Sequence, residues 1–529
     1  MNMKKKALAL LVHAALFGLA APAIAEVGPS TRTAPYMQAM VPGLTITSIL
    51  TTGDVVGGYK MGGIPDGLGA YDNGDGTITV LMNHEIFADT SGPLGVVRAH
   101  GGKGAYVSSW VINKKTLEVV SGADLMKKVF QQAGSSWVPV PATGALGTTS
   151  SFARFCSADL APQSAFFHHG KGTLNRIFLN GEESGPVYQR GLAHVATGPD
   201  KGNTYVLPWA TSANASWENF LANPYSGDKT VVIGNSDGGT GGVYVYVGTK
   251  TNSGNDIERA GLVGGTLYRV AVKGNVAETR AADAGFGLLP NVRGNLAGSF
   301  ALVAGPDTAN AASTRFLRPE DGAWDKKDHN RYYFVTTDQM DAAKDGGVNT
   351  DIAANQVGRS RLWALNFVDS SKPELGGTIE LMLDGTLANG EYQMFDNITV
   401  HDDGTLTLLE DVGNNQHNGK MWKFNPVTGD LVKIARFDPA LFGDIGKTGT
   451  LTKDEETSGV IDVTKLLGRN DGRVYSLFVV QNHAPSFDPE TVEGGQLLLM
   501  SQRAAKRDDD EGREAREGHD DERHEGGRR

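Results

Sequence analysis

One short pattern recurs six times along the chain: a turn, a run of β-forming residues, and then a cluster of polar residues. The runs and their clusters are 75–82 with Asn83, His84 and Glu85; 172–179 with 180–183; 229–234 with 235–237; 332–335 with 336–338; 403–409 with 410–411; and 474–480 with 481–483. Helical periodicity is nearly absent after the first 25 residues, and Gly, Asn and Asp separate the short runs. This arrangement is typical of an all-β protein.

A second β-rich run follows most of these units, as at 107–113, 242–247, 362–367 and 421–425. Six such units predict a six-bladed β-propeller, which arranges equivalent strands around a central channel. The units lie from about 50 to about 100 residues apart, so we expect long insertions between blades. The run 497–500 comes last and needs a sheet partner, so we expect strands from both ends of the chain to pair.

In this fold, the position of the polar clusters at the ends of strands would bring them close together. In a propeller the inner strands run along the channel, so polar residues at their ends converge near its axis. Crowded carboxylates cost several kcal/mol each to desolvate unless cations neutralise them. The clusters therefore predict bound metal. The alternative is that each cluster only ends a strand in a turn, as Asn and Asp commonly do.

The first 25 residues have the form of an export signal. Lysines at 4–6 precede an apolar stretch at 7–20, and the small residues Ala23 and Ala25 place cleavage before Glu26. No later segment reaches the roughly 18 apolar residues of a transmembrane helix. We therefore expect a periplasmic or secreted protein with no membrane span.

Three segments follow from composition: a signal peptide at 1–25, the propeller domain at 26–502, and a tail at 503–529. The tail contains almost no apolar residue and is rich in charge, so it is predicted to be disordered. The formal net charge of −11 gives no indication of a nucleic-acid partner. We expect a monomer.

Cys156 is the only cysteine in a chain predicted to be exported, where cysteines usually pair as disulfides. Two interpretations are open. Cys156 is a small buried hydrophobic residue, as most free cysteines are. Alternatively, a metal holds it as a thiolate, which keeps it both deprotonated and protected.

Five segments, taken in order, resemble motifs of the PhoX-type alkaline phosphatases, a secreted bacterial family with a propeller fold. They are Asp66-Gly67-Leu68 with Asn83-His84-Glu85, Cys156 with Ala161-Pro162, Glu182-Glu183, Arg318-Pro319-Glu320, and Phe395-Asp396-Asn397. The resemblance covers most of the mature chain at the level of short motifs. It implies a metal-dependent phosphoesterase that hydrolyses small phosphate monoesters.

In that family Cys, Glu and Asp side chains hold an iron and calcium cluster, and an arginine helps to grip the phosphate. The resemblance therefore implies Ca²⁺ and Fe³⁺ as cofactors and Arg318 as the catalytic phosphate clamp. It also implies seven metal ligands: Glu85, Cys156, Glu182, Glu183, Asp237, Glu320 and Asp396. The residue types suit these roles, because thiolate favours iron or zinc, carboxylates favour calcium, and the guanidinium fork matches phosphate oxygens.

The chain departs from the family pattern near the expected site. The segment 161–165 lacks the Trp and Gly of the family's Thr-Pro-Trp-Gly-Thr, and the interval between Cys156 and Glu182 is longer than the family's. Where the family has His-Glu, this chain has Ala193-His194-Val195. The export signal also lacks twin arginines.

Other interpretations stay open beside the phosphoesterase. One is a non-catalytic, calcium-stabilised propeller that binds a ligand; another is a phytase-like or lactonase-like propeller hydrolase. Cys156 distinguishes an enzyme of the proposed type, which needs the thiol in the channel, from a binding module that leaves it among apolar side chains. The acidic pair Glu455 and Glu456 belongs either to a solvated loop or, through Glu456, to the channel.

Overall fold

The computed structural model of the protein describes residues 24–213, 215–237, 241–278, 287–288, 296–305, 313–337, 360–385, 392–413, 417–444 and 447–503. Most of the described regular structure is strand, which confirms the all-β class. The described α-helices are single turns: α1 (Pro208–Thr211), α2 (Asp256–Arg259), α4 (Pro439–Phe442) and α5 (Thr464–Leu467). The expected signal peptide up to residue 23, Asp338, and the tail from 504 lie outside the described residues.

Two of the larger sheets come from the first half of the chain. One contains, in order from its innermost strand, β6 (Pro65–Asp72), β7 (Thr77–His84), β10 (Tyr106–Asn113) and β11 (Val119–Asp124). The other contains β14 (Ala158–Asp159), β17 (Ile177–Gly181), β18 (Gly191–Val195), β19 (Asn203–Leu207), β12 (Lys128–Ala133) and β13 (Ser136–Pro139).

A ten-stranded sheet occupies the middle of the chain. Its order is β20 (Trp217–Ala222), β21 (Lys229–Ser236), β22 (Val243–Thr249), β23 (Thr266–Val272), β25 (Leu296–Ala304), β29 (Gly377–Asp384), β28 (Arg361–Phe367), β27 (Arg331–Thr336) and β26 (Pro319–Trp324), with β24 (Gly287–Leu288) paired to β25. β25 therefore joins two four-stranded meanders.

Two further sheets draw on both ends of the chain. One contains β30 (Phe395–Val400), β31 (Leu406–Glu410), β32 (Lys420–Phe424), β33 (Leu431–Phe437) and β2 (Met37–Ala39). The other contains β34 (Glu455–Asp462), β35 (Arg473–Asn482), β36 (Gly494–Arg503), β3 (Thr45–Thr51) and β1 (Ile24–Val27). Small hairpins add β4 (Val55–Val56) with β5 (Tyr59–Lys60), β8 (Ala88–Asp89) with β9 (Gly92–Pro93), and β15 (Phe167–His168) with β16 (Lys171–Gly172).

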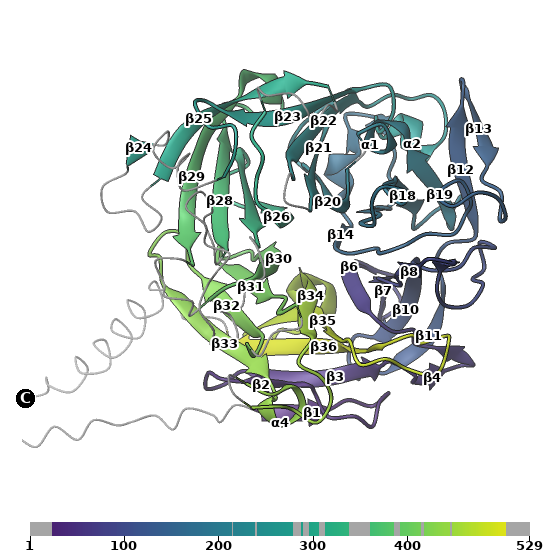
Figure 1. Ribbon diagram of the computed structural model, residues 1–529, viewed down its shortest axis with the longest axis vertical. Helices are drawn as coiled ribbons and strands as arrows, with labels where there is room; N and C mark the ends of the chain where they lie inside the picture. Colours follow the sequence, from purple (N-terminus) through teal and green to yellow (C-terminus); the bar gives the residue numbers. More distant parts are fainter. Residues whose placement is uncertain are drawn as a thin grey trace, which may run out of the picture.

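The sheets are arranged in a ring, and β6, β14, β20, β26, β30 and β34 lie nearest its middle (Figure 1). Contacts run from each of these strands to the next around the whole ring, including from β34 back to β6. The β-rich runs that precede the polar clusters in the sequence are instead the strands second from the middle of the ring, such as β7, β21 and β35. The innermost strands escaped notice because they are short or interrupted by bulges, and therefore lack long runs of β-forming residues.

The ring closes through pairing of the two chain ends, as expected. β36 lies antiparallel to β3, with Thr47 opposite Leu499. The last strand of the chain therefore finds its partner in one of the first strands.

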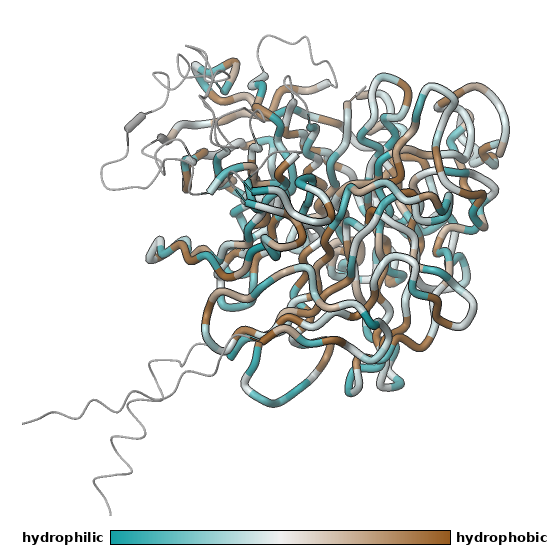
Figure 2. The backbone as a smooth tube through the Cα atoms, turned by 60° about the horizontal axis from the view of Figure 1, so that its bottom comes forward, coloured by the Kyte–Doolittle hydropathy of each residue, from teal (hydrophilic) through white to brown (hydrophobic). Residues whose placement is uncertain are grey.

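The described core consists of six hydrophobic clusters, each lying between neighbouring sheets or neighbouring meanders of the ten-stranded sheet. Fully buried Trp110, Trp217 and Trp363 each belong to a different cluster. Figure 2 shows hydrophobic stretches running through the body of the ring. Burial between the sheets thus fixes their spacing, and with it the positions of the innermost strands.

Candidate metal centre

Five of the innermost strands carry a carboxylate as their second residue. These residues are Asp66 of β6, Glu218 of β20, Glu320 of β26, Asp396 of β30 and Glu456 of β34. In four of these strands the pairing register with the next strand shifts across the carboxylate, whereas in β34 the shift lies after it, between Ser458 and Ile461. A bulge of this kind re-aims a side chain, so the same local irregularity accompanies four of the five acids.

The second strands supply a matching set of acids at their ends. Glu85, Asp237 and Asp411 each directly follow β7, β21 or β31, and Glu183 follows β17 by two residues. Because adjacent strands are antiparallel, the start of an innermost strand and the end of its neighbour lie at the same edge of the sheet. Both sets of acids therefore face one end of the channel.

Cys156 takes the place of the innermost-strand carboxylate in the remaining sheet. It lies two residues before β14 and shares a backbone feature with three of the acids: the residue two positions earlier has a positive φ. The pairs are Ile64 and Asp66 (φ 48°), Arg154 and Cys156 (50°), Arg318 and Glu320 (56°), and Met394 and Asp396 (56°).

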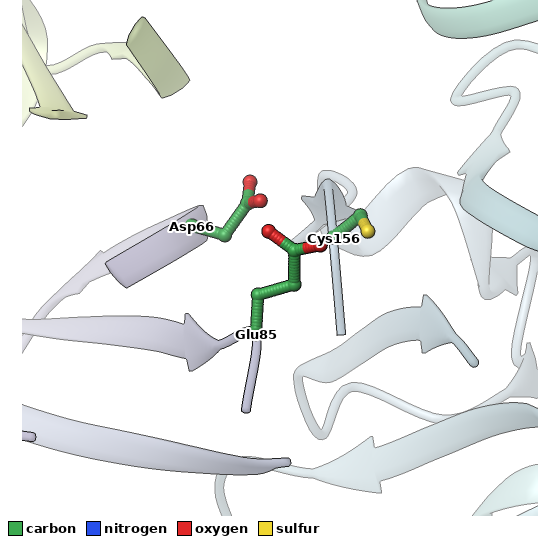
Figure 3. Close-up of side chains that lie close together, drawn as sticks. All are labelled: Asp66, Glu85 and Cys156. Carbon is green, nitrogen blue, oxygen red and sulfur yellow. The ribbon is translucent and has the colours of Figure 1, made fainter. Parts of the chain in front are cut away.

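Potential ligand atoms of these side chains form four groups of three, each with all atoms within 4.8 Å of one another. The groups are Asp66, Glu85 and Cys156; Cys156, Glu183 and Glu218; Glu218, Glu320 and Asp396; and Asp396, Asp411 and Glu456. Figure 3 shows the first group, in which three separate segments extend side chains into the same space. Consecutive groups share a member, so the donors form one continuous cluster rather than isolated sites.

Two arginines lie within this acidic cluster. Arg154 places Nε 2.6 Å from Glu85 Oε1 and Nη2 3.1 Å from Glu183 Oε2. Arg318 places Nε 2.8 Å from Asp237 Oδ1. Its Nη2 lies 2.9 Å from Glu320 Oε1, close enough for an ion pair but without the alignment of a hydrogen bond.

The amide of Gln481 bridges three carboxylates from the opposite side. Its Nε2 donates to Asp66, Glu85 and Glu456 at 3.0, 3.0 and 3.2 Å. Its Oε1 is buried and has no hydrogen-bond partner, and Glu320 Oε1 is buried with no hydrogen bond beside its ion pair with Arg318. Buried oxygens without hydrogen bonds are costly, and a cation among these carboxylates would satisfy them.

Burial raises the pKa of most groups in the cluster, and neighbouring carboxylates add to that effect. The groups are Asp66, Cys156, Glu183, Glu218, Glu320, Asp396, Asp411 and Glu456. Glu85 is also buried, but Arg154 and His483 hold its pKa below the usual value. Arg318 likewise outweighs burial and lowers the pKa of Asp237. So many buried carboxyls cannot all ionise without additional positive charge.

The donor set fits divalent or trivalent cations. Carboxylate oxygens predominate, as hard cations such as calcium require, and a single thiol offers a softer donor. The Cys156 Sγ donates to Glu183 Oε2 at 2.9 Å. Cys156 is buried among these polar groups and belongs to none of the six hydrophobic clusters. Its side chain therefore contacts acidic groups, unlike that of an apolar core residue.

The structure brings most of the predicted site residues together. Glu85, Cys156, Glu183, Arg318, Glu320 and Asp396 line one small cavity. Asp237 lies beside it, in contact with Arg318 and hydrogen-bonded to Glu183. Glu182 is the exception: its carboxylate faces away and pairs with Arg190, with Arg190 Nε donating to Oε2 at 2.6 Å and Ala153 N donating to Oε1 at 3.2 Å.

Several residues of the site were not predicted as ligands: Asp66, Arg154, Glu218, Asp411, Glu456 and Gln481. The pattern Trp217-Glu218-Asn219 matches Phe395-Asp396-Asn397, so repetition of an acid followed by a small or polar residue could have identified Glu218. Glu456 lies in the cluster and not in a solvated loop.

The other end of the channel is a separate pocket of about 440 Å³. It is lined by later residues of the innermost strands, including Ala222, Trp324 and Val400, and by Asp159 and Asp321. Burial raises the pKa of Asp159 and of Asp321 to about 7. The two ends of the channel therefore differ: one is acidic and narrow, and the other is wider and mixed in character.

No family model matches the chain, and no curated protein matches it by sequence. Among solved structures, PhoX of Pseudomonas fluorescens in complex with vanadate, a transition state analogue, matches with a TM-score of 0.57 at 11% identity, covering 88% of this chain and 96% of that chain. The chain therefore has a PhoX-like fold. A GH43 β-xylosidase/α-arabinofuranosidase from a compost microbial metagenome (9% identity, 84% and 92% coverage) and a GH43_1 enzyme from Xanthomonas citri (8%, 84% and 88%) have TM-scores of only 0.30 and 0.31. No helix in the described residues is long and apolar enough to cross a membrane.

Proposed function

We propose that the chain is a six-bladed β-propeller. The support is that the chain repeats a four-stranded unit six times if the ten-stranded sheet is divided at β25. The six innermost strands and the six hydrophobic clusters agree with that division.

We propose further that the protein is a metal-dependent phosphoesterase that acts on phosphate monoesters at the acidic end of the channel. One observation carries this proposal: four overlapping groups of ligand atoms form a continuous cluster, and one of its members, Glu320, forms an ion pair with the guanidinium of Arg318. The fold shared with PhoX, a protein solved with vanadate, agrees with it. In keeping with the export signal, the enzyme would act in the periplasm or outside the cell, as a monomer.

The carboxylates would hold Ca²⁺, and Cys156 together with Glu183 would hold Fe³⁺. Bound cations polarise a phosphoryl group and stabilise the charge that develops on it. Arg318 would bind the phosphoryl oxygens through its planar fork and orient the group in the channel mouth. The salt bridges from Arg318 to Asp237 and Glu320 hold that guanidinium in place beside the cluster. Burial of the surrounding carboxylates limits the competition from bulk water.

The test is turnover of an aryl phosphate by protein supplied with calcium and iron, measured with the metal content of the same sample. Arg318→Ala should lower kcat/KM by about 10²-fold or more while metal content stays unchanged. Arg331→Ala is a matched control, because Arg331 also pairs with a carboxylate, Glu380 at 3.0 Å, and is similarly exposed. It lies at the start of β27, whereas the end of β27 lies beside the cluster, with Thr336 opposite Pro319. A metal-loaded wild-type protein without turnover would favour the ligand-binding propeller instead, with the 440 Å³ pocket as the place to look for its ligand.

A further inference from the structure

Arg154 and Arg318 occupy equivalent positions in two different sheets. Each has a positive φ, 50° and 56°, and each stands two residues before a candidate ligand, Cys156 or Glu320. The innermost strand begins at the residue after Arg318 and four residues after Arg154. The backbone therefore presents the two side chains in a similar way, although the meander β20–β23 lies between β14 and β26 around the ring.

The contacts of the two guanidinium groups are also alike. Arg154 bridges Glu85 and Glu183, as Arg318 bridges Asp237 and Glu320. Both arginines line the same cavity. The Glu183 carboxyl is hydrogen-bonded to Asp237, so one pair of acids separates the two guanidiniums.

The ion pairs do not use all the N–H donors of either arginine. The ion pairs of Arg154 use Nε and Nη2, and its side chain is still 43% exposed; the Arg318 side chain is 24% exposed. A guanidinium carries five N–H donors. Both side chains therefore remain partly accessible to solvent beside the cluster.

We propose that Arg154 is a second phosphate-binding residue that acts opposite Arg318 and selects phosphate monoesters over diesters. The proposal rests on the proposed function. A monoester dianion has three terminal oxygens and two negative charges, whereas a diester has two terminal oxygens and one charge. Two guanidinium forks on either side of the Glu183–Asp237 pair can be satisfied by the monoester and are left partly unpaired by the diester.

Binding of inorganic phosphate to the metal-loaded protein, measured by calorimetry, tests this without requiring turnover. Arg154→Ala should weaken phosphate binding at least about tenfold, as loss of a charged hydrogen bond does, and by a factor similar to that of Arg318→Ala. Arg331→Ala should have no effect. Wild-type affinity in Arg154→Ala, or no phosphate binding by the wild-type protein, would overturn the proposal.

Arg154→Lys guards against a purely structural explanation. Lysine keeps a positive charge beside Glu85 and Glu183 but lacks the planar fork. We expect metal content and melting temperature close to wild type, with phosphate affinity still reduced severalfold. Full affinity in the lysine variant would mean that charge alone matters and would overturn the assignment of the fork.

Specificity is tested by kcat/KM for an aryl phosphate monoester and for the corresponding aryl methyl diester. Arg154→Ala should reduce the monoester value about tenfold more than the diester value. Equal reductions would overturn the selectivity. If the wild-type protein binds phosphate but hydrolyses neither ester, the proposed function fails, while calorimetry still decides whether Arg154 binds phosphate.

Discussion

Replacing Glu182 by Gln separates two roles that adjacent glutamates play at the end of β17. The Glu182 carboxylate accepts hydrogen bonds from Arg190 N, Nε and Nη2 and from Ala153 N, at 3.1, 2.6, 2.9 and 3.2 Å. All four partners are donors, so the amide NH₂ of a glutamine has no acceptor here. Arg190 is itself buried, and the substitution leaves its charge without a counterion.

Breaking a buried ion pair in this way costs about 3–5 kcal/mol. Unfolding entropy of about 2.1 cal/mol/K per residue, summed over roughly 480 residues, gives about 1 kcal/mol/K, so the melting temperature should fall by about 3–5 °C. Metal content should not change, because Glu182 lies outside the cluster.

Thermal melts and elemental analysis of Glu182→Gln and Glu183→Gln provide the comparison. Glu183→Gln should lose bound metal, because Glu183 shares a ligand group with Cys156 and Glu218. If Glu182→Gln instead loses metal at an unchanged melting temperature, the placement of the two carboxylates is wrong.

Four further outcomes follow from the cluster and its surroundings. Calcium at 100 times its dissociation constant should add about 2.7 kcal/mol of stability per site, and the gain should be larger at pH 8.5 than at pH 5.5. Burial raises the pKa of Glu455 from 4.5 to about 9, so without metal its contribution to stability is greatest at low pH and falls as the pH rises from 4.5 to about 9; melts with chelator across this range should show the decline, and a rise would contradict it. Cys156→Ser should remove the transition metal but leave calcium largely in place; unchanged metal content and activity would show that the thiol is not a ligand. Glu218→Gln should reduce metal content, since Glu218 belongs to two ligand groups, whereas Glu118→Gln on the exposed surface should not.

The sequence predicted the strands that carry long runs of β-forming residues, and it predicted that polar groups gather at their ends. It did not reveal the innermost strands. β14 is only two residues long, and β6 and β26 contain glycine next to their bulges. Their signal is therefore weak by composition, although these strands supply half of the site.

The sequence also could not show which of two adjacent glutamates faces the cluster. Glu182 and Glu183 are chemically identical neighbours, and successive side chains of extended backbone point in opposite directions. Which one faces the cluster depends on the position of Arg190, which forms a salt bridge with Glu182 on the side away from the cluster. Arg154 was missed for a related reason, because its partner Glu85 lies 69 residues away.

Pairing of β36 with β3 has a consequence for how the protein matures. Gln481 and Asp66 meet across 415 residues of chain, and Ser458 and Asp66 across 392. Contacts of such sequence separation form late and slowly, and a partial chain contains both halves of the cluster only once Gln481 has been synthesised. Synthesis must therefore be nearly complete before the acidic cluster can form. Cations would enter at the final step and hold the ring shut at its axis, so refolding yield should depend on calcium while the earliest burial of β-sheet should not.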